Sequence, residues 1–162
     1  IITAITLTAI FRALIGLIPV SVLAIPLFGV SIFKLGLILI LLLLNLHIFG
    51  VCLGILVSSG LIRFGPAFEN IAWASLFLLA PLGCIYYPID ILPTWLQHVA
   101  TALPLVHIFE EARNILINER FVLQNLIYAT SLTLLYFIFS IFIFHIFFKQ
   151  AKKKGTLMNM GE

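Results

Sequence analysis

The chain has 162 residues, of which 63% are hydrophobic and only 9% are charged, and its mean hydropathy is +1.25. Soluble domains carry about a quarter charged residues, so this composition excludes an ordinary soluble globular domain. It predicts an all-α polytopic membrane protein with about four transmembrane helices, in a single domain over residues 1–162.

The net charge is +3, and the basic residues nearest the C-terminus directly follow the last apolar stretch: Lys149, Lys152, Lys153 and Lys154. A nucleic-acid patch is the competing interpretation of a lysine run. The adjacent apolar stretch and the lack of interleaved aromatic residues disfavour that interpretation. Lys and Arg beside a membrane span are retained in the cytoplasm, so the cluster predicts a cytoplasmic C-terminus.

The first apolar stretch runs from Ile1 to about Phe28 and is long enough to cross a bilayer. Arg12 lies inside it, and a charge at mid-depth costs about 2.5–3.5 kcal/mol. We therefore expect Arg12 near the cytoplasmic interface, with Ile1 to Phe11 lying partly along the membrane surface. A short turn that ends at Lys34 follows.

The second stretch, Leu35 to Val57, is the clearest predicted span. Asn45 and His47 point in directions about 200° apart on a helix. Asn45 is expected to form an interhelical hydrogen bond rather than to contact a substrate. The Gly-x-x-x-Gly spacing at 50–54 is typical of close helix packing. The small residues Ser58, Ser59 and Gly60 predict the end of the span.

A third span is expected from Glu69 or Asn70 to about Ile85, and a final one from about Leu126 to Phe148. Between them, the helical pieces 94–103 and 105–117 are too short to cross. This pattern predicts a re-entrant hairpin between the last two spans, which is tolerated where protein or water covers the backbone. An external loop with surface helices is the alternative.

Four spans with a cytoplasmic C-terminus define an orientation for the whole chain. The first span crosses outward, the second inward, the third outward and the fourth inward. This orientation places Arg12 and the loop around Arg63 in the cytoplasm, with Lys34, Arg113 and Arg120 outside, and it agrees with the excess of basic residues inside.

The positions of the cysteine, methionine and histidine residues support three further expectations. Cys52 and Cys84 both fall in apolar stretches and are expected to be buried rather than paired or bound to metal. The first methionine is Met158, so we expect that the natural N-terminal portion is missing. In the segment His107-x-x-Glu110-Glu111 a second metal-binding histidine is absent, which disfavours a zinc site.

Glu110 and Arg113 are three residues apart, so they can pair on one helix face. An exposed pair contributes only a few tenths of a kcal/mol, and a structural role is then sufficient. In a hairpin near lipid, pairing also avoids the cost of an isolated charge.

Several short motifs occur in an order that resembles a known family. They are Gly60-Leu61-Ile62-Arg63-Phe64-Gly65, Ala80-Pro81-Leu82-Gly83, Tyr86-Tyr87-Pro88, Leu92-Pro93-Thr94-Trp95-Leu96-Gln97 and the segment from Leu103-Pro104-Leu105 to Arg113. In order and spacing, this set is similar to the last extracellular region and the preceding cytoplasmic loop of ABC-2 type permeases. These proteins are the membrane subunits of ATP-driven ABC exporters.

The resemblance implies that this chain corresponds to spans three to six of a six-span permease of bacterial type, which is surrounded by lipid in the inner (plasma) membrane. It implies a dimer, with a homodimer expected, around a central pathway. ATP would be bound by a separate ATP-binding cassette subunit, so neither enzymatic activity nor a cofactor is expected in this chain. Nucleic acid is not expected as a partner. The implied outer gate comprises Tyr86, Tyr87, Pro88, Glu110 and Arg113. The implied ATPase-facing loop comprises Arg63, Phe64 and Gly65.

Two other classes of membrane protein fit the apolar composition. A secondary transporter or channel would usually show ionisable residues across several spans, or paired broken helices in an internal repeat. A membrane enzyme would need a catalytic cluster at one depth. The sequence shows neither pattern, and it does not identify a transported substrate.

Overall fold

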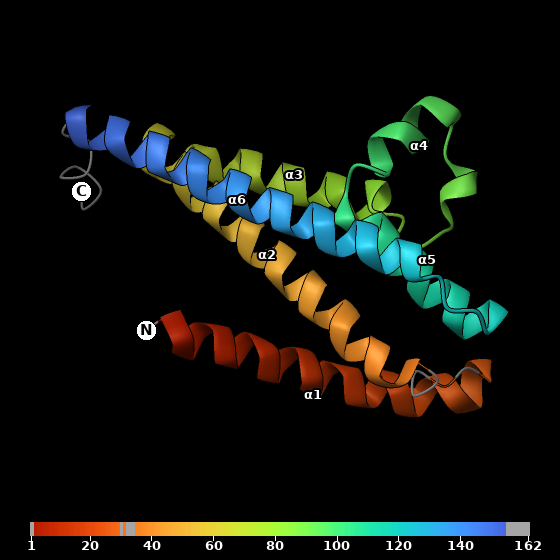
Figure 1. The fold of residues 1–162 in the computed structure, drawn as a ribbon. Coiled ribbons are helices and arrows are strands. Elements are labelled where there is room, and N and C mark those ends of the chain that lie inside the picture. Colours follow the sequence, from red (N-terminus) through yellow and green to blue (C-terminus); the bar gives the residue numbers. More distant parts are fainter. Residues whose placement is uncertain (1, 30, 32–34, 155–162) are drawn as a thin grey trace.

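The computed structural model describes residues 2–29, 31 and 35–154, with the backbone alone at positions 2–6, 9, 10, 13, 14, 21, 28 and 154. Every described element is helical (Figure 1). They are α1 (Ile2–Phe28), α2 (Gly36–Phe64), α3 (Phe68–Leu82), the short 3-10 helix η2 (Ile89–Ile91), α4 (Thr94–Ala100), α5 (Pro104–Asn118) and α6 (Leu123–Lys154). The predicted turn at Lys34 and Met158 lie outside the described residues.

Two of these helices, α2 and α6, are long and apolar enough to cross a membrane. In their most apolar stretches only 22% of the residues of α2 and 11% of those of α6 are buried within the chain. The core helix of a soluble protein would be mostly covered by its own chain. The faces of α2 and α6 are instead open and apolar, as Leu37 and Ile138 illustrate with exposures of 78% and 69%.

α2 and α6 lie side by side and run in the same direction, whereas α1 and α3 run opposite to them (Figure 1). We call their shared interface the α2–α6 seam. It buries Leu42, Asn45, Phe49, Cys52 and Ser59 from α2, and Ala129, Thr133 and Ser140 from α6. Phe49 meets Tyr136 edge to face, with ring centroids 5.5 Å apart.

The residues of the seam follow a seven-residue period in both helices. Asn45, Cys52 and Ser59 are seven positions apart, as are Thr133 and Ser140. A repeat of this length keeps one stripe of a helix facing its partner, and small side chains let the two backbones approach. The seam is therefore the main packing interface of the two longest helices.

The prediction that Ser58, Ser59 and Gly60 end the second span is wrong. α2 continues through them to Phe64, because both serine hydroxyls donate hydrogen bonds to carbonyls one turn earlier, at distances of 2.8 and 2.7 Å. Helix α2 ends instead at Gly65, whose φ of 78° is easily adopted only by glycine.

Close packing of α2 occurs at Gly60 and not at the predicted Gly-x-x-x-Gly motif. A Cβ atom at Gly50 or Gly54 would meet nothing within 4 Å, whereas one at Gly60 would lie 2.1 Å from the ring of Phe68. Asn45 is buried in the seam, but its amide donates to the Leu41 carbonyl of its own helix, at 3.0 Å, instead of forming the expected interhelical bond.

The remaining boundaries differ modestly from those expected. α1 is one helix that continues through Arg12. The expected position of residues 1–11 along the membrane surface stays a prediction. α3 ends at Leu82 rather than near Ile85, because Cys84 adopts a left-handed conformation with φ 52°. The two short helices predicted over residues 94–103 and 105–117 are confirmed as α4 and α5. The re-entrant course of this segment stays a prediction.

Candidate functional site

Helix α5 packs against α2 and α6, at the end of the molecule where α4 lies. Ile108 and Ile115 pack into one apolar cluster with Leu35, which directly precedes α2, Leu42 of α2 and Ala129 of α6. Val106 packs on the other side, with Cys84 and Ala100. α5 begins with Pro104, a residue suited to the first helical turn because it needs no amide donor there. Its amphipathic sequence thus places α5 between the long helices and the segment that follows α3.

Glu110 and Arg113 form the predicted ion pair, with Arg113 Nη1 2.9 Å from Glu110 Oε1. Their side chains are 21% exposed for Arg113 and 22% for Glu110, so most of each is shielded from solvent. The same Glu110 oxygen accepts a hydrogen bond of 2.9 Å from the backbone N–H of Ile89. The pair is therefore attached to the start of η2.

Arg113 also binds the turn between α3 and η2. Its Nη1 atom donates to the Tyr87 carbonyl at 3.1 Å, and its Nη2 atom donates to the Cys84 carbonyl. A planar guanidinium suits such multiple contacts, which a lysine ammonium does not reproduce. We call these contacts of Glu110 and Arg113 with residues 84–89 the α5 network.

Tyr87 closes the turn from the other side, because its hydroxyl donates a 2.8 Å hydrogen bond to the Pro81 carbonyl at the end of α3. Of the five implied gate residues, Tyr87, Glu110 and Arg113 are thus brought together in one set of hydrogen bonds. Tyr86 is 80% exposed, and Pro88 is also exposed.

The three polar residues of the His107 segment face different partners. The His107 Nε2 atom lies 2.9 Å from the Thr101 carbonyl, and Glu110 binds Ile89. Glu111 is fully buried and accepts hydrogen bonds from Val122 N at 2.8 Å and from Asn125 Nδ2 at 3.0 Å. The segment therefore does not converge on a common point where a metal ion could bind.

Sequence reasoning did not identify the role of Glu111. A signal was present in the residues before α6, Arg120-Phe121-Val122, which contain no Ser, Thr, Asp or Asn. Such residues normally accept the unpaired N–H groups at a helix start. Their absence indicates that the acceptor comes from another part of the chain.

The implied ATPase-facing residues lie at the opposite end of α2, beside the last turns of α6. The Arg63 guanidinium lies 5.2 Å from the ring centroid of Phe64 and 5.0 Å from that of Phe147. Arg63 and Phe64 are in the helix and only Gly65 is outside it, so the predicted loop is shorter than expected. The contribution of Phe147 was also not predicted.

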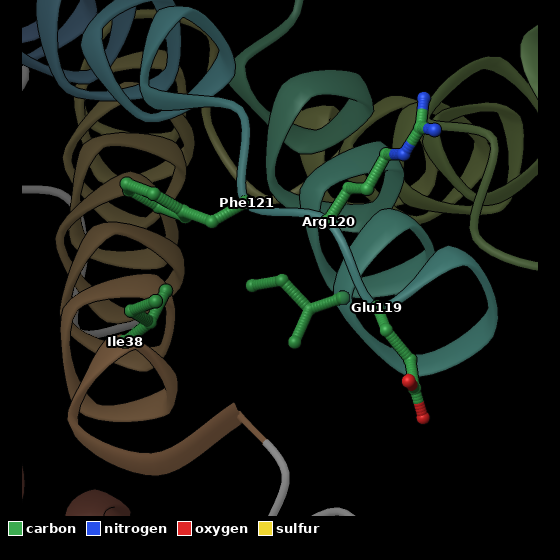
Figure 2. Close-up of a pocket in the computed structure, with 5 residues that line it drawn as sticks. Ile38, Glu119, Arg120 and Phe121 are labelled. Carbon is green, nitrogen blue, oxygen red and sulfur yellow. The ribbon is translucent and has the colours of Figure 1, made fainter.

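A cavity of about 390 Å³ lies between the start of α2 and the connection from α5 to α6. Its lining residues are Ile38, Ile115, Glu119, Arg120 and Phe121. Figure 2 shows the charged ends of Glu119 and Arg120 directed away from Ile38. The cavity wall is thus mainly apolar, and no residue of the α5 network lines it.

No family model, curated protein or solved structure matches the chain. The resemblance to ABC-2 permeases therefore depends on the sequence motifs alone. The other observations on which a function can be proposed are the α5 network and the contacts of Arg63 with Phe64 and Phe147.

Proposed function

We propose that this chain is part of a membrane-spanning permease subunit of an ABC-2 type exporter. The observation that best supports the proposal is the α5 network. Pro81, the Tyr87-Pro88 turn and the Glu110 to Arg113 segment belong to motif pieces that are separate in the sequence. Hydrogen bonds of Tyr87, Glu110 and Arg113 connect them.

In this proposal the chain crosses the membrane four times, through α1, α2, α3 and α6. The hairpin of α4 and α5 lies between the last two crossings on the outer side. The alternating directions of α1, α2 and α3, and the direction of α6, are those that four crossings require (Figure 1). Arg63 and the lysines at the end of α6 then lie in the cytoplasm, in agreement with the preference for basic residues on that side.

The two ends have different proposed roles. The α5 network holds the outer gate region in place, while Arg63, Phe64 and Gly65 face a separate ATPase subunit that binds ATP. Two permease copies pair around the pathway, with lipid covering the open apolar faces of α2 and α6. Arg63 is suited to this position because its cation–π contacts with two rings couple the ends of α2 and α6.

Co-purification tests the partner directly. The full-length subunit is expressed together with the ATPase encoded beside it and purified through a tag on the permease. We expect the ATPase to co-purify and its hydrolysis to respond to transported compounds. Arg63→Ala should weaken the association, whereas Arg120→Ala, at the opposite end, should leave it unchanged.

Two results would contradict the proposal. One is the absence of a phosphate-loop ATPase in association with the permease. The other is uptake of a compound by the purified permease alone, driven by an ion gradient. The second result would favour a secondary transporter.

A further inference from the structure

Glu111 is the most deeply buried charged residue of the described chain, and its position connects two helices. Its exposure is 0%, although it lies on α5 next to Glu110, which is partly exposed. A carboxylate is stable in such a position only where donors replace the lost water. Both oxygens of Glu111 have such donors: Oε1 accepts from Val122 N, and Oε2 accepts from Asn125 Nδ2.

Val122 directly precedes α6, and Asn125 lies in its first turn. The first N–H groups of a helix have no partner within the helix, and the helix dipole favours a negative charge at that end. Val122 and its neighbours Phe121 and Leu123 are exposed, so apolar packing contributes little to holding this first turn. Asn125 N also bonds the Val122 carbonyl, at 3.0 Å, which extends the same turn.

We propose that Glu111 is a positioning residue that caps the first turn of α6 from α5. It thereby attaches the hairpin to the long helix that follows. α5 then has two separate attachments. Glu110 and Arg113 hold the turn at 84–89, and Glu111 holds α6. If the chain belongs to an exporter, as proposed above, Glu111 would transmit movement of α6 to the gate region. This role rests on the proposed function.

Amide hydrogen exchange of the purified full-length protein tests the attachment without an ATPase or a substrate. Failure of the exporter proposal and failure of this one are therefore separate results. In Glu111→Ala, amides 122 to 125 should exchange about tenfold faster or more, because a hydrogen bond to a charged group is lost. The amide of Ile89, which binds Glu110, should keep its protection.

Conservative variants distinguish positioning from general stability. Glu111→Gln keeps an oxygen for Val122 N and an amide that can pair with a rotated Asn125, so its exchange should remain within about threefold of the wild type. Asn125→Ala should accelerate amides 122 to 125 by a few-fold, about that expected for one neutral-group bond. Glu69→Ala and Asn118→Ala, at exposed positions, serve as matched controls and should change nothing in this segment.

Two outcomes would overturn the proposal. In the first, Glu111→Ala leaves amides 122 to 125 at the wild-type rate. In the second, it accelerates amides throughout the α2–α6 seam by the same factor, which indicates only a loss of overall stability. If Glu111→Ala does not accumulate, Asn125→Ala decides the question, and an unchanged exchange rate in that variant rejects the attachment.

Discussion

The α5 network is partly exposed and the α2–α6 seam is buried, and different interactions stabilise them. In the network, the side chains of Glu110 and Arg113 bind backbone groups at Cys84, Tyr87 and Ile89. In the seam, small and apolar side chains repeat every seven residues. Asn45 and Ser140 donate hydrogen bonds within their own helices, and the buried Thr133 hydroxyl has no hydrogen-bond partner among the described residues. The comparison shows that hydrogen bonds of a few residues stabilise the segment of α4 and α5, whereas packing along two whole helices stabilises the seam. Single polar substitutions should therefore affect the hairpin far more than the seam.

The largest effect is expected for Arg113→Ala. The substitution leaves Glu110 without its partner and two carbonyls without donors, at a cost of about 3 kcal/mol, near the lower end for a buried pair because both groups are partly exposed. Thermal unfolding in detergent measures the loss, and rapid exchange of the Ile89 amide would locate it. Arg113→Lys should recover only part of the stability. A loss below about 0.5 kcal/mol, the scale of a surface pair, would show that the network contributes little.

Gly60→Ala tests the packing side of the comparison. The added Cβ would lie 2.1 Å from the Phe68 ring, so the ring or α3 has to shift. Overpacking of this kind typically costs about 1–3 kcal/mol. Gly54→Ala is the matched control, because its Cβ meets nothing within 4 Å and alanine is the better helix former. Equal melting temperatures for the two variants would argue against the contact between Gly60 and Phe68.

Tyr87→Phe should have a smaller effect. It removes only the hydroxyl that donates to the Pro81 carbonyl, which is worth about 1 kcal/mol. Tyr86→Phe provides the comparison, since the Tyr86 side chain is 80% exposed and should be insensitive to the change. Denaturation midpoints of both variants can be measured in the same detergent. A larger loss of stability in Tyr86→Phe than in Tyr87→Phe would contradict the hydrogen bond from Tyr87 to Pro81.

The smallest effect is expected for Asn45→Leu in the seam. Polar contacts between membrane helices contribute on average about 0.6 kcal/mol, and the bond made by Asn45 lies within its own helix. A double-mutant cycle with Thr133→Val should show no coupling. A coupling above about 1 kcal/mol would mean that the seam contains an interhelical polar contact after all.

Local patterns predicted much of the architecture. The apolar stretches around residues 35–57 and 126–148 predicted the two longest helices, and the prolines and amphipathic spacing predicted α4 and α5. The pairing of Glu110 with Arg113 followed from their spacing. These features depend on neighbours in the sequence, which a single sequence displays directly.

Features that depend on distant contacts were missed. Ser58 and Ser59 were interpreted as a helix end, although hydroxyl bonds to their own helix let α2 continue to Phe64. Gly50 and Gly54 have the spacing of a packing motif, but only the position of Phe68 reveals that Gly60 is the crowded glycine. Likewise, the partners of Glu111 are known only once α5 lies against the start of α6.

The unequal lengths of α3 and α6 have a consequence for the surrounding bilayer. With 15 residues, α3 is about 22 Å long, whereas α6, with 32 residues, is about 48 Å long. The hydrocarbon core of a typical bilayer is about 30 Å thick. If both helices cross it, α6 has a surplus at its ends. Lipid beside α3 has to thin, or the turn at residues 83–87 has to enter the hydrocarbon core. Membrane thickness would then act on the turn that Arg113 holds, and short-chain lipids should stabilise it.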